Sequence, residues 1–364
     1  MTVAEGHGSD DGFFRAPLLL HSLSELREVI FPCLDLSGAR TIVEVGGEDG
    51  TFTRELLAWA QKSQGAVYCV DPQPSEKLVQ LCAQSDAAEL ISDRSPEALD
   101  TLDRADAYVL DGDHNYYTVK SELEAIERKS RNGDGMPLVF LHDVGWPCGR
   151  RDQYYSPESL PSEAVHPHTY DRGVTPESRG VIEGGFRGAG EFAFAVQEGG
   201  EANGVLTAVE DFLEGHADLA LAKVPCVFGL GVIYRMSSPE GRAAGELLRP
   251  YDGNPLLERL ERNRMALFLR VLETQDDLRS IAAQLESAAL QVRDVATENR
   301  ALWARNAELE SRVSVLEVEL RSVLHSSAFV VAERLSSLRR VTPERPGLSR
   351  QRLRAALEGP DSSP

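Results

Sequence analysis

Apolar runs of four or five residues, each followed by acidic or glycine residues, alternate with helix-length segments in the first part of the chain. These runs cover residues 41–45, 67–70, 107–110 and 138–141. Short apolar runs in this alternation are typical of a parallel sheet with crossover helices. In such sheets, ligands bind at the carboxyl ends of the strands. The pattern therefore predicts an α/β, Rossmann-like domain with a binding site at one sheet edge.

A different pattern extends over residues 256–325, where apolar residues recur at alternating spacings of three and four. A sustained heptad of this kind indicates a left-handed coiled coil. Two asparagines at a positions, Asn299 and Asn306, favour a parallel homodimer with a fixed register. The a positions are Leu278, Leu285, Val292, Asn299, Asn306, Val313 and Leu320, and the d positions are Ile281, Ala288, Val295, Leu302, Leu309, Leu316 and Val323.

The two patterns divide the chain into parts. We expect a disordered N-terminus over 1–12, an α/β domain over 13–235, a linker over 236–255, the coiled coil over 256–325, and a basic, partly disordered tail over 326–364. The apolar run 224–234 suits a closing antiparallel hairpin.

One segment within the α/β domain, residues 146–200, is rich in glycine, proline, arginine and aromatic residues and lacks periodicity. Structureless segments of this length are usually lids or binding loops. Its Arg150 and Arg151 would be available to a glycan or to a sugar-nucleotide phosphate. An ordinary variable insertion is the alternative.

Composition narrows the class of protein. The chain has 364 residues, of which 42% are hydrophobic, so it can bury a large core. A net charge of −20 argues against a partner made of nucleic acid. Five scattered cysteines and a polar, acidic N-terminal segment predict neither disulfides nor a secretory signal, so we expect a cytoplasmic protein.

The tail has the opposite charge. Seven arginines and a single acid, Glu344, lie between Arg334 and Arg354. This segment favours an anionic partner, either the inner face of a membrane or a polysaccharide-assembly component, with solvated disorder as the alternative.

Candidate ligand-binding residues lie at the ends of the apolar runs. Glu44 lies in the first run, and Gly46 and Gly50 lie in the turn after it. Glycine allows a positive φ and a close approach of the backbone to a ligand. This segment resembles motif I of class I S-adenosylmethionine-dependent methyltransferases, which implies that these three residues bind the cofactor. It departs from the motif at Glu48, where the family usually has glycine.

Further cofactor residues follow from the same resemblance. Asp71, at the end of the second run, would accept both ribose hydroxyls, and Asp93 and Ser95 would contact the adenine. The alternative is that such strand-end residues cap the following helices.

The most specific segment contains Asp111, Asp113 and His114, followed later by His142 and Asp143. It is similar to a sub-family that includes macrolide-sugar and rhamnosyl O-methyltransferases and cephalosporin-hydroxylase-like proteins. The resemblance implies a Mg²⁺ site formed by Asp111, His142 and Asp143, with Asp111 also beside the cofactor. An imidazole is an unusual Mg²⁺ ligand, which favours Mn²⁺ or no metal at all.

Methyl transfer to an alcohol requires a group that removes the hydroxyl proton. His114 is the first candidate because imidazole titrates near neutrality, and Asp113 is the second. The predicted function is S-adenosylmethionine-dependent O-methylation of a sugar or glycan hydroxyl. The alternatives are a catalytically degenerate scaffold in a polysaccharide-biosynthesis complex and a hydroxylase-like oxygenase.

Overall fold

The computed structural model describes residues 19–131, 135–338 and 350–358. The N-terminal segment that we expected to be disordered lies outside the described residues. The chain divides into two compact units, the first ending at Asp277 and the second beginning at Leu278. Each unit is described by itself.

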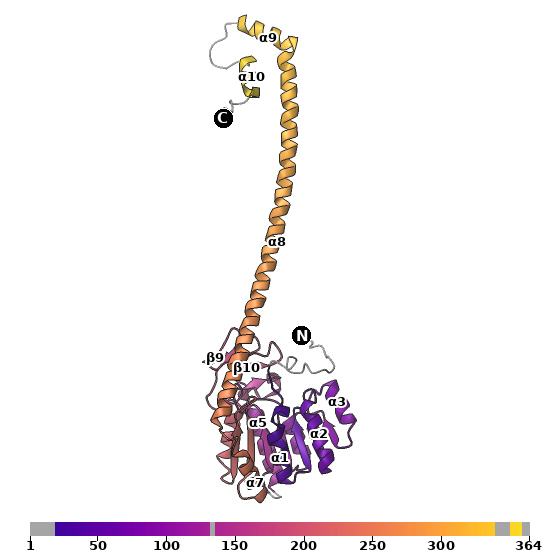
Figure 1. Cartoon of the computed structure of the whole chain (residues 1–364), viewed down its shortest axis with the longest axis vertical. Coiled ribbons are helices and arrows are strands. Elements are labelled where there is room, and N and C mark those ends of the chain that lie inside the picture. Colours follow the sequence, from indigo (N-terminus) through magenta and orange to yellow (C-terminus); the bar gives the residue numbers. More distant parts are fainter. Residues whose placement is uncertain (1–18, 132–134, 339–349, 359–364) are drawn as a thin grey trace. The chain divides into compact units, whose positions relative to one another are not determined.

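Unit 1 is built of strands and helices (Figure 1). Its main sheet has seven strands in the order β11-β12-β5-β4-β1-β2-β3. The five strands β1 to β5 pair in parallel, and β12 pairs antiparallel with both β5 and β11. The strands are β1 (Thr41–Val45), β2 (Ala66–Val70), β3 (Ala88–Ile91), β4 (Ala107–Leu110), β5 (Leu138–Leu141), β11 (Leu219–Val224) and β12 (Leu230–Arg235). This topology confirms the predicted Rossmann-like fold and its closing antiparallel hairpin.

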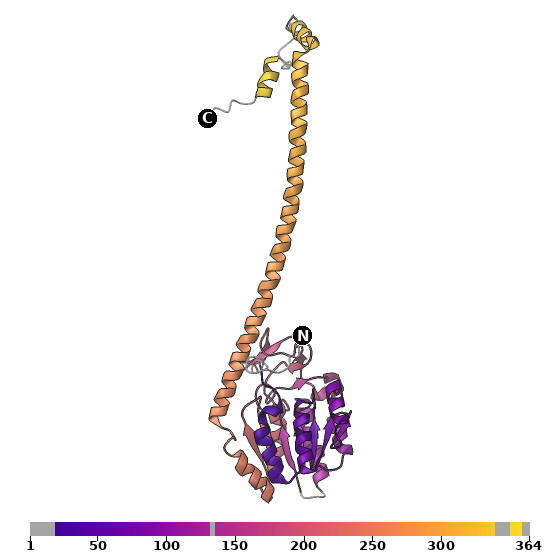
Figure 2. The same ribbon diagram turned by 45° about the vertical axis from the view of Figure 1, so that its right-hand side comes forward.

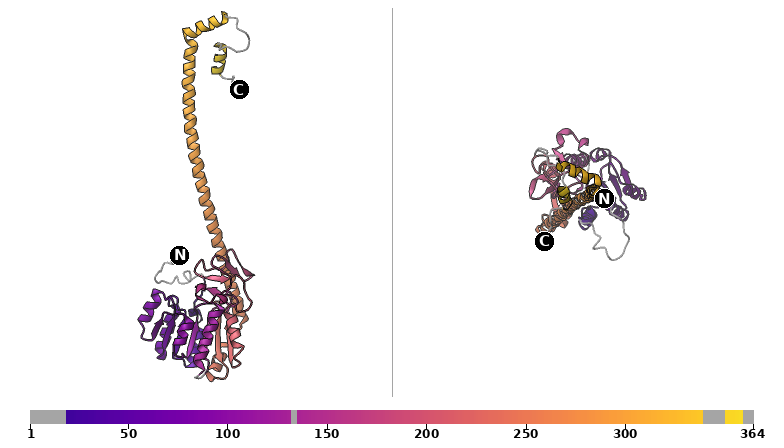
Figure 3. Two further views of the ribbon diagram at one scale, coloured as in Figure 1. Left: turned by 180° about the vertical axis from the view of Figure 1, so that it is seen from behind. Right: turned by 90° about the horizontal axis from the view of Figure 1, so that it is seen from above.

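Helices cover both faces of the sheet, as Figures 2 and 3 show. Neighbouring strand residues face opposite sides, so Ile42 packs into one hydrophobic core and Val43 into the other. One core includes α1 (Arg27–Ser37), α2 (Thr51–Ser63), α3 (Glu76–Ala83), α7 (Pro239–Leu248) and the 3₁₀ helix η2 (Leu23–Leu26); the other includes α4 (Ser95–Thr101), α5 (Tyr116–Ser130) and α6 (Val205–Leu213).

The segment expected to be a lid contains short strands. β6 (Gln153–Tyr154), β10 (Ala193–Ala195) and β7 (His168–Thr169) form one small sheet, β8 (Gly173–Thr175) and β9 (Ser178–Ile182) form another, and η3 (Pro157–Ser159) and η4 (Ser162–Ala164) are single turns.

A buried carboxylate ties this insertion to the domain. Asp152 accepts hydrogen bonds from the backbone N–H groups of Tyr116 and Gly204, at 2.8 and 2.7 Å, and from the Tyr154 hydroxyl. These contacts join the insertion to the starts of α5 and α6.

Of the two arginines expected to bind a ligand, Arg151 is enclosed within the fold and Arg150 is partly exposed. Arg151 is fully buried and donates hydrogen bonds to the carbonyls of Ala195 and Arg179. Arg150 pairs with Glu210 on α6 at 2.6 Å. Both guanidinium groups therefore stabilise the insertion, because each already has partners within the fold.

The segment expected to be a linker contains helix α7, which buries Ala244 and Leu248 in the first core. The long helix α8 (Pro255–His325) starts directly afterwards. Its first turns belong to unit 1, where Met265 is buried. The unit boundary thus lies about twenty residues after the start of the expected coiled coil.

Unit 2 contains the rest of α8, together with α9 (Ser327–Leu338) and α10 (Arg350–Glu358). Most side chains at the a and d positions are exposed in the single chain, with Leu285 at 66% and Val292 at 69%. Three of the tail arginines, at positions 339, 340 and 345, lie outside the described residues. Within the part of the chain that is described, no helix combines the length and apolarity needed to cross a membrane.

Candidate functional site

Two neighbouring strands bring the acidic residues together. Leu110 at the end of β4 pairs with Leu141 at the end of β5, and the backbone N–H of His142 donates to the Leu110 carbonyl at 3.0 Å. Asp111 follows the first strand, and His142 and Asp143 follow the second. The parallel register therefore places these side chains at the same sheet edge.

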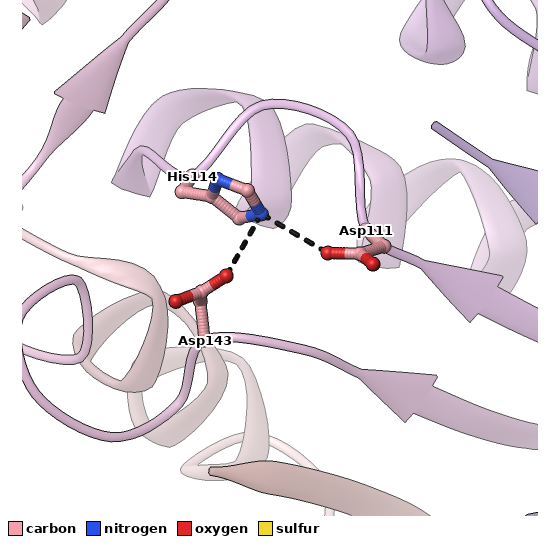
Figure 4. A group of neighbouring side chains, drawn as sticks. All are labelled: Asp111, His114 and Asp143. Atoms are coloured by element: carbon pink, nitrogen blue, oxygen red, sulfur yellow. Dashed lines mark hydrogen bonds and ion pairs between the residues drawn. The ribbon is translucent and has the colours of Figure 1, made fainter. Parts of the chain in front are cut away.

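Four side chains meet there, and Figure 4 shows three of them. His114 Nε2 lies 3.2 Å from both Asp111 Oδ1 and Asp143 Oδ2. His142 Nδ1 lies 2.9 Å from Asp111 Oδ1 and 3.3 Å from Asp143 Oδ2. We call Asp111, His114, His142 and Asp143 the strand-end cluster.

Electrostatics within the strand-end cluster favour charged groups. Burial alone would lower the pKa of His114, yet the nearby Asp143 and Asp111 raise it to about 9. Burial would also lower the pKa of His142, but Asp111 and Asp143 raise it to about 10. Burial would raise the pKa of Asp111, but the two histidines hold it well below its usual range. The two acids therefore favour the protonated forms of both imidazoles.

The cluster also has the donors for a metal ion. One ligand atom each from Asp111, His114 and Asp143 lie within 4.8 Å of one another. His142 Nε2 points to the Val227 carbonyl at 2.8 Å, so Nδ1 is the nitrogen that faces the two acids. A set of two carboxylates and imidazole nitrogen fits an ion such as Mn²⁺ better than Mg²⁺. The expected ligands Asp111, His142 and Asp143 lie together, and His114 lies with them.

Asp113 turns to a different set of partners. Its Oδ2 accepts hydrogen bonds from Asn115 Nδ2 at 2.6 Å and from the Thr118 hydroxyl at 3.2 Å. Asn115 in turn caps the start of α5. Burial raises the pKa of Asp113. These contacts give Asp113 a role in ordering the turn before α5, while the adjacent His114 faces the strand-end cluster.

The expected cofactor residues lie around the switch point of the sheet, where β1 has β2 on one side and β4 on the other. Gly46 has a φ of 82°, and a Cβ atom there would lie 2.2 Å from the Asp111 carbonyl oxygen. Only glycine fits this contact between the first turn and the strand-end cluster. Gly50 has a φ of 80° and is the N-cap residue of α2.

The departure from motif I is visible in the backbone. Glu48 has a φ of 45°, a conformation that glycine adopts with less strain. Glu44 is buried beneath the same turn, and burial raises its pKa to about 8. A cation bound nearby would favour the ionised form of Glu44.

Asp71 links the first turn to the second. Its Oδ2 accepts from the Gly47 N–H at 3.2 Å, and its Oδ1 accepts from the Gln73 N–H at 2.9 Å. Asp93, after β3, is exposed and accepts from the Arg94 N–H at 2.8 Å. Both carboxylates lie at the carboxyl edge of the sheet, as the sequence predicts, and both have local backbone partners.

Ser95 shows a partner that sequence reasoning missed. Its hydroxyl donates a hydrogen bond to Glu122 on α5, and both residues are buried. Burial raises the pKa of Glu122 to about 8. Glu122 lies inside an amphipathic helix, where an acidic residue gives no signal of a buried contact.

Tyr155 borders the strand-end cluster on the side of the insertion. Its ring centroid lies 6.2 Å from that of His114, and its side chain remains half-exposed. An aromatic ring with an exposed face beside polar groups is a common feature of sugar-binding sites.

A comparison with known proteins finds a match to part of the chain. Residues 43–144 match the family model described as a methyltransferase domain. The matched segment contains every expected cofactor residue and the whole strand-end cluster. The match supports a class I, S-adenosylmethionine-dependent methyltransferase domain, and it favours neither the scaffold nor the oxygenase alternative. No curated protein matches the chain.

Solved structures with similar folds include an S-adenosylhomocysteine-bound methyltransferase, PaMTH1, from Podospora anserina (13% identity, 59% of this chain and 79% of that chain, TM-score 0.36). Human N-acetylserotonin methyltransferase bound to S-adenosylmethionine has 14% identity over 59% of this chain and 53% of that chain, with a TM-score of 0.34. Precorrin-6y C5,15-methyltransferase from Geobacter metallireducens has 16% identity over 62% and 92%, with a TM-score of 0.33.

Proposed function

We propose that unit 1 is an S-adenosylmethionine-dependent O-methyltransferase that acts on a hydroxyl group of a sugar or glycan. The observation that carries the proposal is the strand-end cluster, which lies beside the glycine turn within the segment matched by the methyltransferase model. Methyl transfer to an alcohol needs a cofactor site and a proton acceptor side by side. The contact between Gly46 and Asp111 joins these two parts.

S-adenosylmethionine, when bound, supplies a methyl group on a sulfonium cation. Gly46 and Gly50 would let the backbone approach it, and Asp71 would accept its ribose hydroxyls. Glu44 would provide a compensating negative charge beneath the turn. The exposed Asp93 and the buried Ser95 would lie next to the adenine.

His114 is the better-placed general base. Its Nε2 lies in the strand-end cluster, whereas the Asp113 carboxylate is occupied by Asn115 and Thr118. The two acids raise the pKa of His114 to about 9, so the free protein holds its proton at neutral pH. Groups that neutralise Asp111 and Asp143 on substrate binding would lower this pKa and make the nitrogen available to the acceptor hydroxyl.

A divalent ion is one such group, and the donors fit it. Asp111, Asp143 and His142 Nδ1 would hold Mn²⁺ or Mg²⁺, and His114 Nε2, which forms a ligand-sized group with the same two acids, is the other nitrogen that could complete the set. The ion would supply Lewis acidity to a bound hydroxyl. If no ion binds, the two imidazolium ions compensate the acids directly.

The acceptor class rests on the resemblance to sugar O-methyltransferases and on Tyr155. Its half-exposed ring beside His114 offers an apolar face to a pyranose ring. We also propose that the chain acts in the cytoplasm as a parallel homodimer, and that the basic tail with α10 contacts an anionic membrane surface or assembly partner.

Titration calorimetry of the full chain with S-adenosylmethionine, followed by mass spectrometry of sugar acceptors, tests the proposal. Asp111→Asn should abolish the gain of one methyl unit while cofactor affinity is largely retained. The exposed Asp86→Asn is the matched control and should transfer methyl groups normally. A wild-type chain that does not bind the cofactor would support a scaffold instead, and normal turnover in Asp111→Asn would refute the assigned centre.

Metal dependence has a separate test. Chelator-treated protein is titrated with Mn²⁺ and with Mg²⁺, and binding is read by calorimetry. Binding of Mn²⁺ that Asp143→Asn weakens would support the ion, whereas equal and negligible heats in both proteins would leave the cluster as a metal-free ion-pair site.

A further inference from the structure

The loop that joins β11 to β12 has an unusual backbone. Val227 and Phe228 are consecutive residues with positive φ, at 50° and 62°. Left-handed conformations are rare outside glycine, and for a β-branched residue such as valine they are true outliers. Such strain persists only where the surroundings impose it, and it concentrates at functional sites. The contacts of the loop on its two sides therefore indicate its role.

A single carboxylate on α8 holds the loop. Glu261 accepts the N–H of Val227 at Oε2, at 3.2 Å, and the N–H of Phe228 at Oε1, at 3.0 Å. Successive backbone N–H groups that converge on one anion are a stable arrangement for turns of this kind. The two residues are separated from Glu261 by more than thirty positions, so this is a tertiary contact.

Arg264 fixes the carboxylate in turn. Its Nε and Nη2 atoms bind the two oxygens of Glu261 at 2.7 and 2.5 Å, and its guanidinium lies 4.9 Å from the centre of the Phe228 ring. Its Nη1 donates to the Leu20 carbonyl at 2.7 Å. Burial would raise the pKa of Glu261, but Arg264 and the loop amides lower it, so the carboxylate stays ionised.

On its other side the loop contacts the strand-end cluster. The Val227 carbonyl accepts a hydrogen bond from His142 Nε2 at 2.8 Å. The Phe228 carbonyl accepts from the Gly145 N–H at 2.6 Å, two residues after Asp143. The loop therefore fixes both the imidazole of His142 and the chain that carries Asp143.

We infer that Glu261 is a positioning residue for the reaction centre. It imposes the left-handed turn at Val227 and Phe228, and this turn directs the Val227 carbonyl at His142 so that Nδ1 faces Asp111 and Asp143. The first turns of the long helix are thus part of the site, although no residue of α8 lies in the strand-end cluster. The catalytic meaning of this contact rests on the proposed function, whereas the contact itself does not.

Glu261→Gln tests the inference because it keeps the size of the side chain but offers only one acceptor to two amides. Exposed Glu258→Gln, on the same helix, is the matched control. The first readout is the ring N–H resonance of His142 in ¹⁵N-histidine-labelled full-length protein, assigned by its loss in His142→Asn. A buried, hydrogen-bonded Nε2–H exchanges slowly with solvent, so its resonance should be sharp in the wild type. We expect it to shift or broaden in Glu261→Gln and to stay unchanged in Glu258→Gln.

The second readout is turnover. We expect Glu261→Gln to lower kcat roughly tenfold, in the range found for residues that orient active-site ligands. The Kd for S-adenosylmethionine should hardly change, because Gly46 and Asp71 follow β1 and β2, whereas His142 and Asp143 follow β5. A folded Glu261→Gln protein with an unchanged His142 resonance and unchanged kcat would overturn the inference.

A milder variant, Arg264→Lys, tests the inference if Glu261→Gln does not fold. Arg264→Lys keeps the positive charge but cannot bind both carboxylate oxygens in the same way. We expect the same His142 shift with a smaller amplitude, and an unchanged resonance would count against the inference. If the wild type transfers no methyl group, the proposed function fails, but the resonance still decides the positioning role.

Discussion

At the scale of single residues, the site is defined by where charge is buried. Glu44 and Glu122 are both buried carboxyl groups whose pKa burial raises to about 8. The strand-end cluster instead compensates its acids with His114 and His142. Burial therefore favours the protonated forms of Glu44 and Glu122, whereas the two histidines favour the ionised form of Asp111.

The first prediction concerns Glu44 and pH. A cationic cofactor favours ionised Glu44, and because burial raises its pKa to about 8, binding near pH 7 should release a proton from it. Affinity for S-adenosylmethionine should therefore rise with pH, by up to about tenfold per unit below this pKa, and then level off. Calorimetry in buffers of different ionisation enthalpy measures the proton directly. Glu44→Gln should bind more weakly without proton release, and an equal release in that variant would show that another group titrates.

The second prediction concerns Asp71. Removing a carboxylate that would accept two ribose hydroxyls should weaken cofactor binding by about 10- to 100-fold, given about 1.5–3 kcal/mol for hydrogen bonds to charged groups. Asp71 also accepts from Gly47 and Gln73, so Asp71→Ala would loosen the turn as well. Asp71→Asn preserves an acceptor for the turn and separates the two effects. Equal affinities for Asp71→Ala and the wild type would remove Asp71 from the cofactor site.

At the scale of elements, the strands and the long helix were predictable and the contacts between distant elements were not. The runs that became β1, β4 and β5 are apolar because both faces are buried, and their polar end residues mark the sheet edge. The strands of the insertion have two to five residues, which is too short for a period to be detected. Helix α7 carried a signal, Ser238 followed by Pro239, that a search for helix starts could have found. Glu261 carried no such sequence signal, because its role depends on a loop more than thirty residues away.

The first turns of α8 give an element-scale prediction. Deletion of residues 278–364 should leave a folded unit 1 that still binds cofactor. Deletion from residue 256 should instead destabilise it by several kcal/mol, because it exposes the core around Met265 and removes Glu261 from its two loop amides. Denaturant unfolding compares the two truncated chains. If both have the same midpoint and slope, residues 256–277 do not stabilise unit 1.

At the scale of the whole molecule, the proposed homodimer rests on the exposed a and d side chains of unit 2. Apolar a and d side chains that are more than half exposed in one chain are covered when two helices pair. The charged residues that flank these positions favour one relative orientation of the two helices. In the heptad frame, Arg305 and Arg312 occupy g positions and Glu310 and Glu317 occupy e positions. A parallel, in-register dimer places each arginine opposite a glutamate of the second chain, whereas an antiparallel pair would juxtapose like charges.

Exposed ion pairs contribute only about 0.2–1 kcal/mol each, so they specify orientation more than affinity. Cysteine crosslinking tests that orientation. In a parallel, in-register dimer, each asparagine at an a position faces its own copy. Asn299→Cys and Asn306→Cys should therefore each form an interchain disulfide on mild oxidation, and Arg300→Cys, on the outer face, should not. Antiparallel helices could bring at most one of the two asparagine positions opposite its copy. Crosslinking of only one variant, or a monomeric wild type in sedimentation equilibrium, would rule out the parallel pair, because both a positions must meet when the helices share direction and register.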